Sequence, residues 1–166
     1  LTEEDGFWYS VAKWLQGLLL MSESELGDED GEPLRRMVTS HLDGQNVLLG
    51  VIALCNVGEL RVKQGRLRAA ERTFQRALSR AESAVGKRLP IAGEPLMWLG
   101  ELARERNDLA AAERYLADGL ELVAQWGPVA AIEGYTALAR LREAQGNRTG
   151  ADEALEEASR LAVSFD

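Results

Sequence analysis

Charged side chains recur at equivalent positions in three stretches of this chain, and their types suit the binding of a polar ligand or an extended peptide. The positions are counted from Gly58, Gly100 and Ala139. They carry Cys55, Glu59, Lys63, Met97, Glu101, Arg104, Glu105, Thr136, Arg140 and Glu143. Alternatively, acidic and basic residues three or four apart form ion pairs within their own helices. Each such pair stabilises its helix by about 0.2–0.5 kcal/mol, and no ligand is then needed to explain the charges.

A second charged motif repeats every fourth residue, at Arg68, Arg72, Arg76 and Arg80. It lies in residues 61–88, whose net charge is +7, whereas the whole chain carries −8. The motif could dock an acidic partner, such as another copy of this chain, or nucleic acid. A solvated helix face is the favoured alternative, because no aromatic residue interleaves for base stacking. The overall acidity predicts no direct contact with nucleic acid.

Residues suited to catalysis or metal binding are scarce. His41 is the only histidine and Cys55 the only cysteine, and neither has a recognisable partner by motif. The run Asp28-Glu29-Asp30-Gly31-Glu32 lacks the alternating carboxylates of a calcium loop. We therefore expect no catalytic residues, no metal site and no enzymatic activity.

A repeated set of offsets indicates which elements hold these side chains. The stretches are Gly58–Gly65–Ala70–Phe74–Ala77, Gly100–Asn107–Ala112–Leu116–Gly119 and Ala139–Gly146–Ala151–Leu155–Ala158. Small residues let two helices approach closely, a turn-former breaks the chain, and a large apolar residue faces back, as in tetratricopeptide repeats. The pattern predicts an all-α, right-handed superhelix of about eight helices in antiparallel pairs, with the first helix of each pair lining the concave face. The charged positions listed first would lie on that face.

The repeats predict a single helical-repeat domain over residues 1–166. Residues 1–46 form an atypical hairpin in this interpretation, and the clear repeats are 47–93, 94–127 and 128–166. Phe74, Leu116 and Leu155 are predicted to be buried, so that truncating each to alanine costs about 2–5 kcal/mol.

Local signals place the turns between helices. Asn107 suits the left-handed residue after a helix end, and Asp108 suits the cap of the next helix. Thr149 and Asp152 have the spacing of a capping box.

The chain shows no segment typical of membrane insertion or export. Its apolar runs are too short or interrupted to span a bilayer, and its first residues are acidic, unlike a signal peptide. With a single cysteine, these features predict a cytoplasmic protein. The abrupt ends suggest a piece of a longer protein.

One strip of sequence has a more specific pattern. Residues 93–113 contain Gly100-Glu101-Leu102 and Glu105-Arg106-Asn107-Asp108-Leu109, and Gly119-Leu120-Glu121-Leu122 and Gln125-Trp126-Gly127 follow. The segments 64–70 and 144–147 fit the same pattern. The strip resembles the helical-repeat region of large bacterial transcription activators of the maltose-activator (MalT-like) LuxR type. The resemblance covers residues 47–165 well and the first 46 poorly.

The resemblance implies a three-part regulator with an ATP-binding module, a superhelical sensor and a DNA-binding helix-turn-helix. In that family the sensor binds an inducer and helps the ATP-bound chain to self-associate. This chain has no phosphate-loop motif and no basic recognition helix. We therefore expect no cofactor here, with ATP bound only by a module upstream.

The function that follows is that of a sensor or interaction domain, binding a small-molecule inducer or a protein partner in its concave groove to control self-association and transcription. The alternative is a freestanding tetratricopeptide scaffold that binds a protein or peptide.

Overall fold

The computed structural model describes residues 47–83, 89–126 and 128–163, and within them it contains helices and turns but no strand. The helices are α3 (Val47–Lys63), α4 (Leu67–Ser83), η1 (Pro90–Ala92), α5 (Gly93–Glu105), α6 (Leu109–Val123), η2 (Ala124–Trp126), α7 (Pro128–Ala144) and α8 (Arg148–Val163). The hairpin predicted for residues 1–46, with His41 and the acidic run at 28–32, lies outside the described residues. The all-α fold is confirmed for the part described, in which six α-helices and two short 3₁₀ helices are present.

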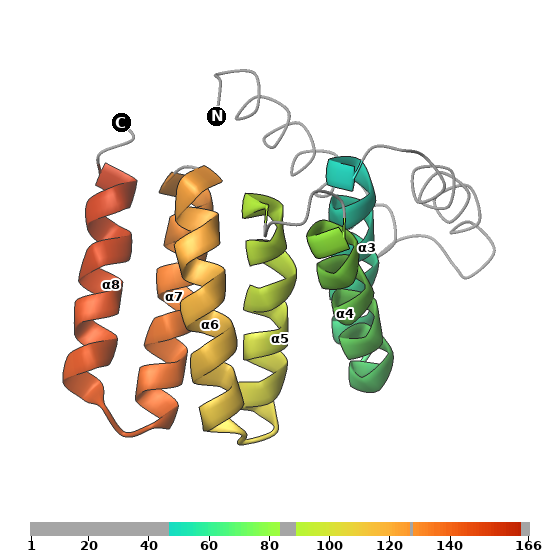
Figure 1. The fold of residues 1–166 in the computed structure, drawn as a ribbon. Coiled ribbons are helices and arrows are strands. Elements are labelled where there is room, and N and C mark those ends of the chain that lie inside the picture. Colours follow the sequence, from blue (N-terminus) through green and yellow to red (C-terminus); the bar gives the residue numbers. More distant parts are fainter. Residues whose placement is uncertain (1–46, 84–88, 127, 164–166) are drawn as a thin grey trace. The chain divides into compact units, whose positions relative to one another are not determined.

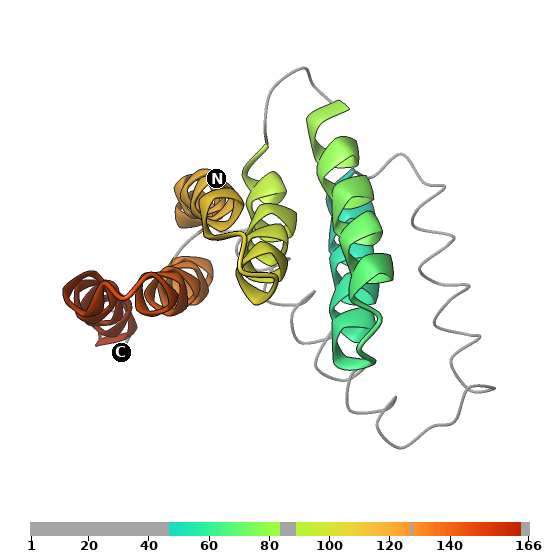
Figure 2. The same ribbon diagram turned by 90° about the horizontal axis from the view of Figure 1, so that it is seen from below.

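The chain divides into two compact units, residues 1–84 and 85–166. In the first unit α3 and α4 form one antiparallel pair (Figure 1). In the second unit α5 pairs with α6 and α7 pairs with α8, and α7 also packs against both α5 and α6. The end-on view shows the four helices of the second unit as two neighbouring pairs, with α8 at the end of the row (Figure 2).

Backbone geometry at the turns explains their sequence. Gly65, Asn107 and Gly146 follow the first helix of each pair and have φ values of 71°, 62° and 75°, in the left-handed region that glycine and asparagine tolerate best. Asp108 caps α6 as predicted, since its carboxylate accepts a hydrogen bond from the Ala111 amide at 3.1 Å.

The capping box predicted at Thr149 and Asp152 is wrong. The side chain of Asn147 caps α8 instead, accepting a hydrogen bond from the Gly150 amide at 2.9 Å. Thr149 already lies inside the first turn of that helix, so its side chain follows the cap position rather than occupying it.

In the pairs α3–α4 and α5–α6, close approach of the two helices depends on a small residue facing a large one. In α3 and α4 a Cβ atom added at Gly58 would overlap the ring of Phe74, which is fully buried. A Cβ atom added at Gly100 would lie 2.6 Å from Cγ of Leu116, which is 1% exposed. The predicted burial of Phe74 and Leu116 is thus confirmed.

The prediction that Leu155 is buried is wrong, because this residue is 48% exposed. Its equivalent Leu116 is buried in a cluster with Ala112, Ala137 and Leu141, to which α7 contributes the last two. α8 is at the end of the described row of its unit, and no described helix of this unit lies on its outer side (Figure 2). A repeat position therefore predicts burial only where a following helix covers it.

None of the helices in the described ranges combines the length and the hydropathy needed to cross a membrane.

Candidate ligand-binding face

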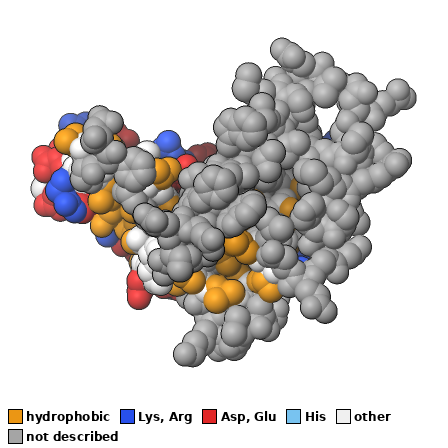
Figure 3. Space-filling view, turned by 90° about the horizontal axis from the view of Figure 1, so that it is seen from above, with side chains coloured by type: hydrophobic (Ala, Val, Ile, Leu, Met, Phe, Trp, Pro, Cys, Tyr) orange, Lys and Arg blue, Asp and Glu red, His pale blue; other side chains and the backbone are white. Residues whose placement is uncertain are grey.

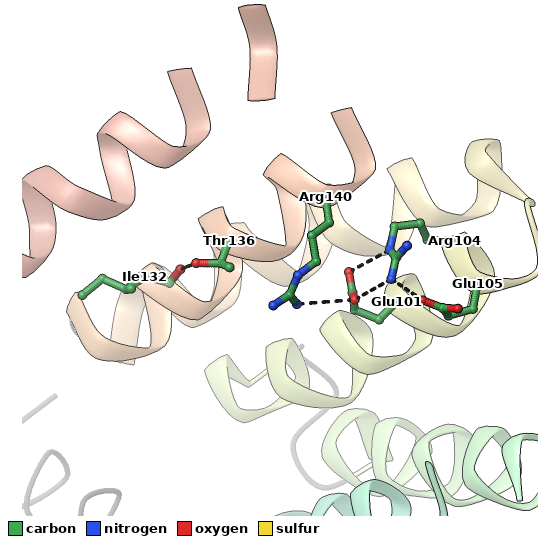
Figure 4. Close-up of polar contacts among 6 residues, drawn as sticks. All are labelled: Glu101, Arg104, Glu105, Ile132, Thr136 and Arg140. Atoms are coloured by element: carbon green, nitrogen blue, oxygen red, sulfur yellow. Dashed lines mark hydrogen bonds and ion pairs between the residues drawn. The ribbon is translucent and has the colours of Figure 1, made fainter. Parts of the chain in front are cut away.

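Two carboxylates and two arginines meet where the first helices of successive pairs lie side by side, α5 and α7 (Figure 4). Glu101 of α5 and Arg140 of α7 occupy equivalent repeat positions, directly after Gly100 and Ala139. Their side chains form an ion pair, with Nη1 of Arg140 3.6 Å from Oε2 of Glu101. The pair joins one repeat to the next through polar side chains.

Arg104 is held more tightly than Arg140. Its Nε and Nη2 atoms donate to Oε1 and Oε2 of Glu101 at 3.4 and 3.2 Å, and Nη2 also donates to Glu105. Partial burial disfavours the charged guanidinium, but the hydrogen bonds and charges of Glu101 and Glu105 outweigh this effect and raise the pKa of Arg104. Arg140, by contrast, is 57% exposed and reaches Glu101 only at a distance longer than a hydrogen bond. Arg140 is therefore the more available cation.

Thr136 adds a hydroxyl group one helical turn before Arg140 (Figure 4). Its Oγ1 atom donates to the carbonyl of Ile132 in its own helix at 2.8 Å. The hydroxyl proton is thus in use, whereas the oxygen lone pairs can still accept a hydrogen bond. We call these five residues, Glu101, Arg104, Glu105, Thr136 and Arg140, the α5–α7 face.

Two other residues predicted for this surface have different surroundings. The Sδ atom of Met97 lies 2.9 Å from the place a Cβ atom of Gly119 would take, and its Cε atom lies 3.7 Å from that of Gly134. Met97 therefore packs against Gly119 of α6 and Gly134 of α7, where the lack of a side chain leaves room for it. Glu143 is exposed and makes no ion pair with a residue in the described ranges. The intrahelical pair expected between Arg140 and Glu143 is replaced by the contact of Arg140 with Glu101.

The first unit holds the remaining predicted residues, all on α3. Cys55 is 1% exposed, so it is a core residue and does not line a binding surface. Its predicted place was wrong because α3 is apolar over most of its length, and periodicity therefore gives its orientation poorly. Glu59 and Lys63 form an intrahelical ion pair of 3.1 Å, as the alternative interpretation expected.

The arginine motif on α4 is shorter than predicted. Arg68, Arg72 and Arg76 are exposed and make no ion pair with any residue that the structure describes. Arg80 differs, because it is partly buried and its guanidinium lies against Gly50 of α3. The absence of a side chain at Gly50 makes room for it, so three arginines rather than four face solvent.

Sequence reasoning missed two polar links between helices. Arg142 of α7 pairs with Glu113 of α6, with Nη2 2.7 Å from Oε1, and Gln145 donates to the same carboxylate at 2.7 Å. In the first unit Arg61 donates to the hydroxyl of Thr73. Each link joins residues on different helices, and only the repeat register could have pointed to such partners.

Among the described residues, no three histidine, cysteine or acidic side chains lie close enough together to bind a metal ion.

Comparison with known families gives one match. The family described as the MalT-like TPR region matches residues 1–166, which is the full length of this sequence. A search of curated proteins and a search of solved structures each found no match.

Proposed function

The chain belongs to the MalT-like TPR region family, and from this premise we propose that it is the sensor and interaction domain of a LuxR-family bacterial transcription regulator. In this proposal its repeats form a right-handed superhelix in the cytoplasm, it has no catalytic activity and no cofactor of its own, and it binds a small inducer or a protein partner. Binding changes self-association of the full protein only if the ligand prefers one of its two states.

The observation that carries the proposal is the pairing of Arg140 with Glu101 across two repeats. The α5–α7 face offers the guanidinium of Arg140, which is 3.6 Å from Glu101, and the carboxylate of Glu101, which also accepts from Arg104. It also offers Oγ1 of Thr136, which can still accept a hydrogen bond. A ligand with an anionic group for Arg140 and a hydroxyl or amide donor for Thr136 would satisfy both. Such a ligand would compete with Glu101 for Arg140 and so act on the contact between α5 and α7.

A thermal-shift screen of small polar metabolites against the 166-residue chain tests this proposal. A ligand at a hundred times its dissociation constant should stabilise the chain by about 2.7 kcal/mol. The variants Arg140→Gln and Thr136→Val should abolish the shift. Glu143→Gln is the matched control, since Glu143 is exposed on the same helix but makes no ion pair with a described residue.

Two results would count against the sensor. A shift that survives both Arg140→Gln and Thr136→Val would place the ligand elsewhere. A chain that binds extended peptides but no metabolite would favour the alternative, a freestanding scaffold. The coding sequence on either side provides a separate test, because the regulator requires a phosphate-loop module upstream and a helix-turn-helix downstream.

A further inference from the structure

Three consecutive residues of α7 contact both helices of the preceding pair. Arg140 forms an ion pair with Glu101 of α5, and Arg142 forms one with Glu113 of α6. Leu141 lies between the two arginines in sequence and is fully buried. Hydrophobic side chains also lie beside acidic and basic ones near α8, in the space-filling view from above (Figure 3). One turn of α7 therefore joins the α5–α6 pair to the α7–α8 pair through two ion pairs and an apolar contact.

The link to α6 is a closed network of three side chains. Nη2 and Nη1 of Arg142 lie 2.7 and 3.0 Å from Oε1 and Oε2 of Glu113, so the guanidinium is bound through two parallel contacts. Gln145 donates to the same carboxylate at 2.7 Å and accepts from Nη1 of Arg142 at 3.0 Å. A bidentate pair of this kind is stronger than a single contact and fixes the orientation of both groups.

Apolar packing adds to the α6 side of the junction. Leu141 packs with Ala112 and Leu116 of α6 in one buried cluster. Nearer the start of α7, a Cβ atom added at Gly134 would lie 2.6 Å from Cδ1 of Leu120 of α6, so the two helices also approach closely there. Side chains packed this closely resist a change in the position of either helix. We call the three-residue network and these packed residues the α6–α7 contact.

The link to α5 is weaker. Arg140 is 57% exposed, and its single contact with Glu101 is longer than a hydrogen bond, at 3.6 Å. To the buried cluster around Leu141, α5 supplies one small side chain, Ala103, with Met97 partly buried at the edge. An ion pair as exposed as this one contributes little to stability and is screened by salt. The two sides of the junction therefore differ in strength.

We propose that the junction between the two helix pairs is a hinge, with the α6–α7 contact as its fixed side and the ion pair between Arg140 and Glu101 as its releasable side. Once Arg140 leaves Glu101, the α7–α8 pair rotates about the α6–α7 contact and α7 moves away from α5, a hinge motion confined to one edge of the interface. This inference does not rest on the ligand-binding proposal, because both links are contacts within the free chain.

Double electron–electron resonance between two nitroxide labels measures each side of the hinge separately. Cys55→Ala removes the only cysteine, and Ala144→Cys then places one label at the end of α7. Glu105→Cys supplies the second label for the α5 side, and Ala110→Cys supplies it for the α6 side. All three labelled positions are exposed. They lie at the end of this unit where the turns α5–α6 and α7–α8 are found (Figure 1).

The releasable side should respond to one substitution and to salt. Arg140→Gln should lengthen the mean distance between labels 105 and 144 by about 2 Å or more, the scale of helix shifts in switching transitions. It should leave the distance between labels 110 and 144 unchanged. Raising the ionic strength from about 0.01 to 1 M shortens the Debye length from about 30 to 3 Å. This increase should reproduce the change in the labelled chain that keeps Arg140, and add nothing to Arg140→Gln.

Two further variants separate the hinge from a general loosening of the fold. Arg148→Gln is the matched control, since Arg148 is exposed at the start of α8 and makes no ion pair with a described residue. It should change neither distance. Glu113→Gln removes the acceptor of the α6–α7 network, so it should broaden the distances between labels 110 and 144. It should also lower the melting temperature more than Arg140→Gln does.

Four outcomes would overturn the proposal. Equal lengthening of both distances would mean that the helix pairs separate as a whole. No change with Arg140→Gln or with salt would mean that the ion pair does not hold α7 near α5. Lengthening on the α6 side alone would place the fixed side at α5. Equal melting temperatures for Glu113→Gln and Arg140→Gln would show that the two links do not differ in strength.

Discussion

Truncation of two equivalent leucines gives the sharpest test of the helix register. Leu116→Ala and Leu155→Ala remove the same atoms at the same repeat position, but the first side chain is 1% exposed and the second 48%. Truncation of a fully buried leucine costs about 2–5 kcal/mol, because it loses both the transfer free energy and the packing around the cavity. We expect about 3.5 kcal/mol for Leu116→Ala. Leu155→Ala leaves no closed cavity and loses roughly half the transfer free energy, so we expect about 1 kcal/mol.

Urea denaturation followed by tryptophan fluorescence measures the difference. Replacing Trp8 and Trp14 by phenylalanine leaves Trp98 and Trp126 as reporters of the unit formed by residues 85–166. If the free energy of unfolding falls by about 2 kcal/mol per molar urea, the urea concentration at the unfolding midpoint should fall by about 1.7 M for Leu116→Ala and about 0.5 M for Leu155→Ala.

Val163→Ala serves as the exposed control, since Val163 is 77% exposed and its truncation should change stability by less than about 0.5 kcal/mol. Equal losses for the two leucine variants would refute the reasoning. That result would mean that Leu155 is covered as completely as Leu116.

Three further substitutions test single features of the fold. Gly100→Ala places a Cβ atom 2.6 Å from Cγ of Leu116 and should lower the free energy of unfolding by about 1–3 kcal/mol. The loss should be smaller when Leu116 is already replaced by alanine, and a double-mutant cycle measured by thermal unfolding checks this. Asn147→Ala removes the cap of α8 and should cost about 1 kcal/mol, whereas Thr149→Ala should stay within about 0.5 kcal/mol; equal urea midpoints would contradict the assigned cap. Asn107→Ala should cost about 1 kcal/mol at its positive φ, and Asn107→Gly should not destabilise the chain in the same measurement.

The helix pairs could be predicted from the sequence because their causes are local. A turn with positive φ requires glycine or asparagine, as at Gly65 and Asn107, and a close crossing requires a small residue opposite a large one, as at Gly58 and Phe74. These requirements recur in each repeat, so the offsets reveal them. Leu155 shows the limit of this reasoning, since the same offset gives an exposed side chain when no described helix of its unit follows.

The candidate site was harder to predict because its contacts lie between repeats. Glu101 and Arg140 were both predicted to lie on the binding surface, but their mutual contact was not, since each has closer partners of opposite charge along its own helix. Spacing along one helix identifies partners three or four residues away. Partners on a neighbouring helix depend on how two repeats pack, which the sequence of either helix alone does not specify.

The contact between Glu101 and Arg140 is the point at which a ligand would act in the function proposed above. Both residues have the same repeat offset, so stacking two repeats brings equal positions together, and opposite charges at that offset attract where like charges would repel. A ligand that takes Arg140 from Glu101 removes this attraction but leaves Arg104 bound to the same carboxylate. A ligand of this kind would therefore act first at the junction between α5 and α7. In the function proposed above, self-association then changes only if the two states of the protein bind the ligand with unequal affinity.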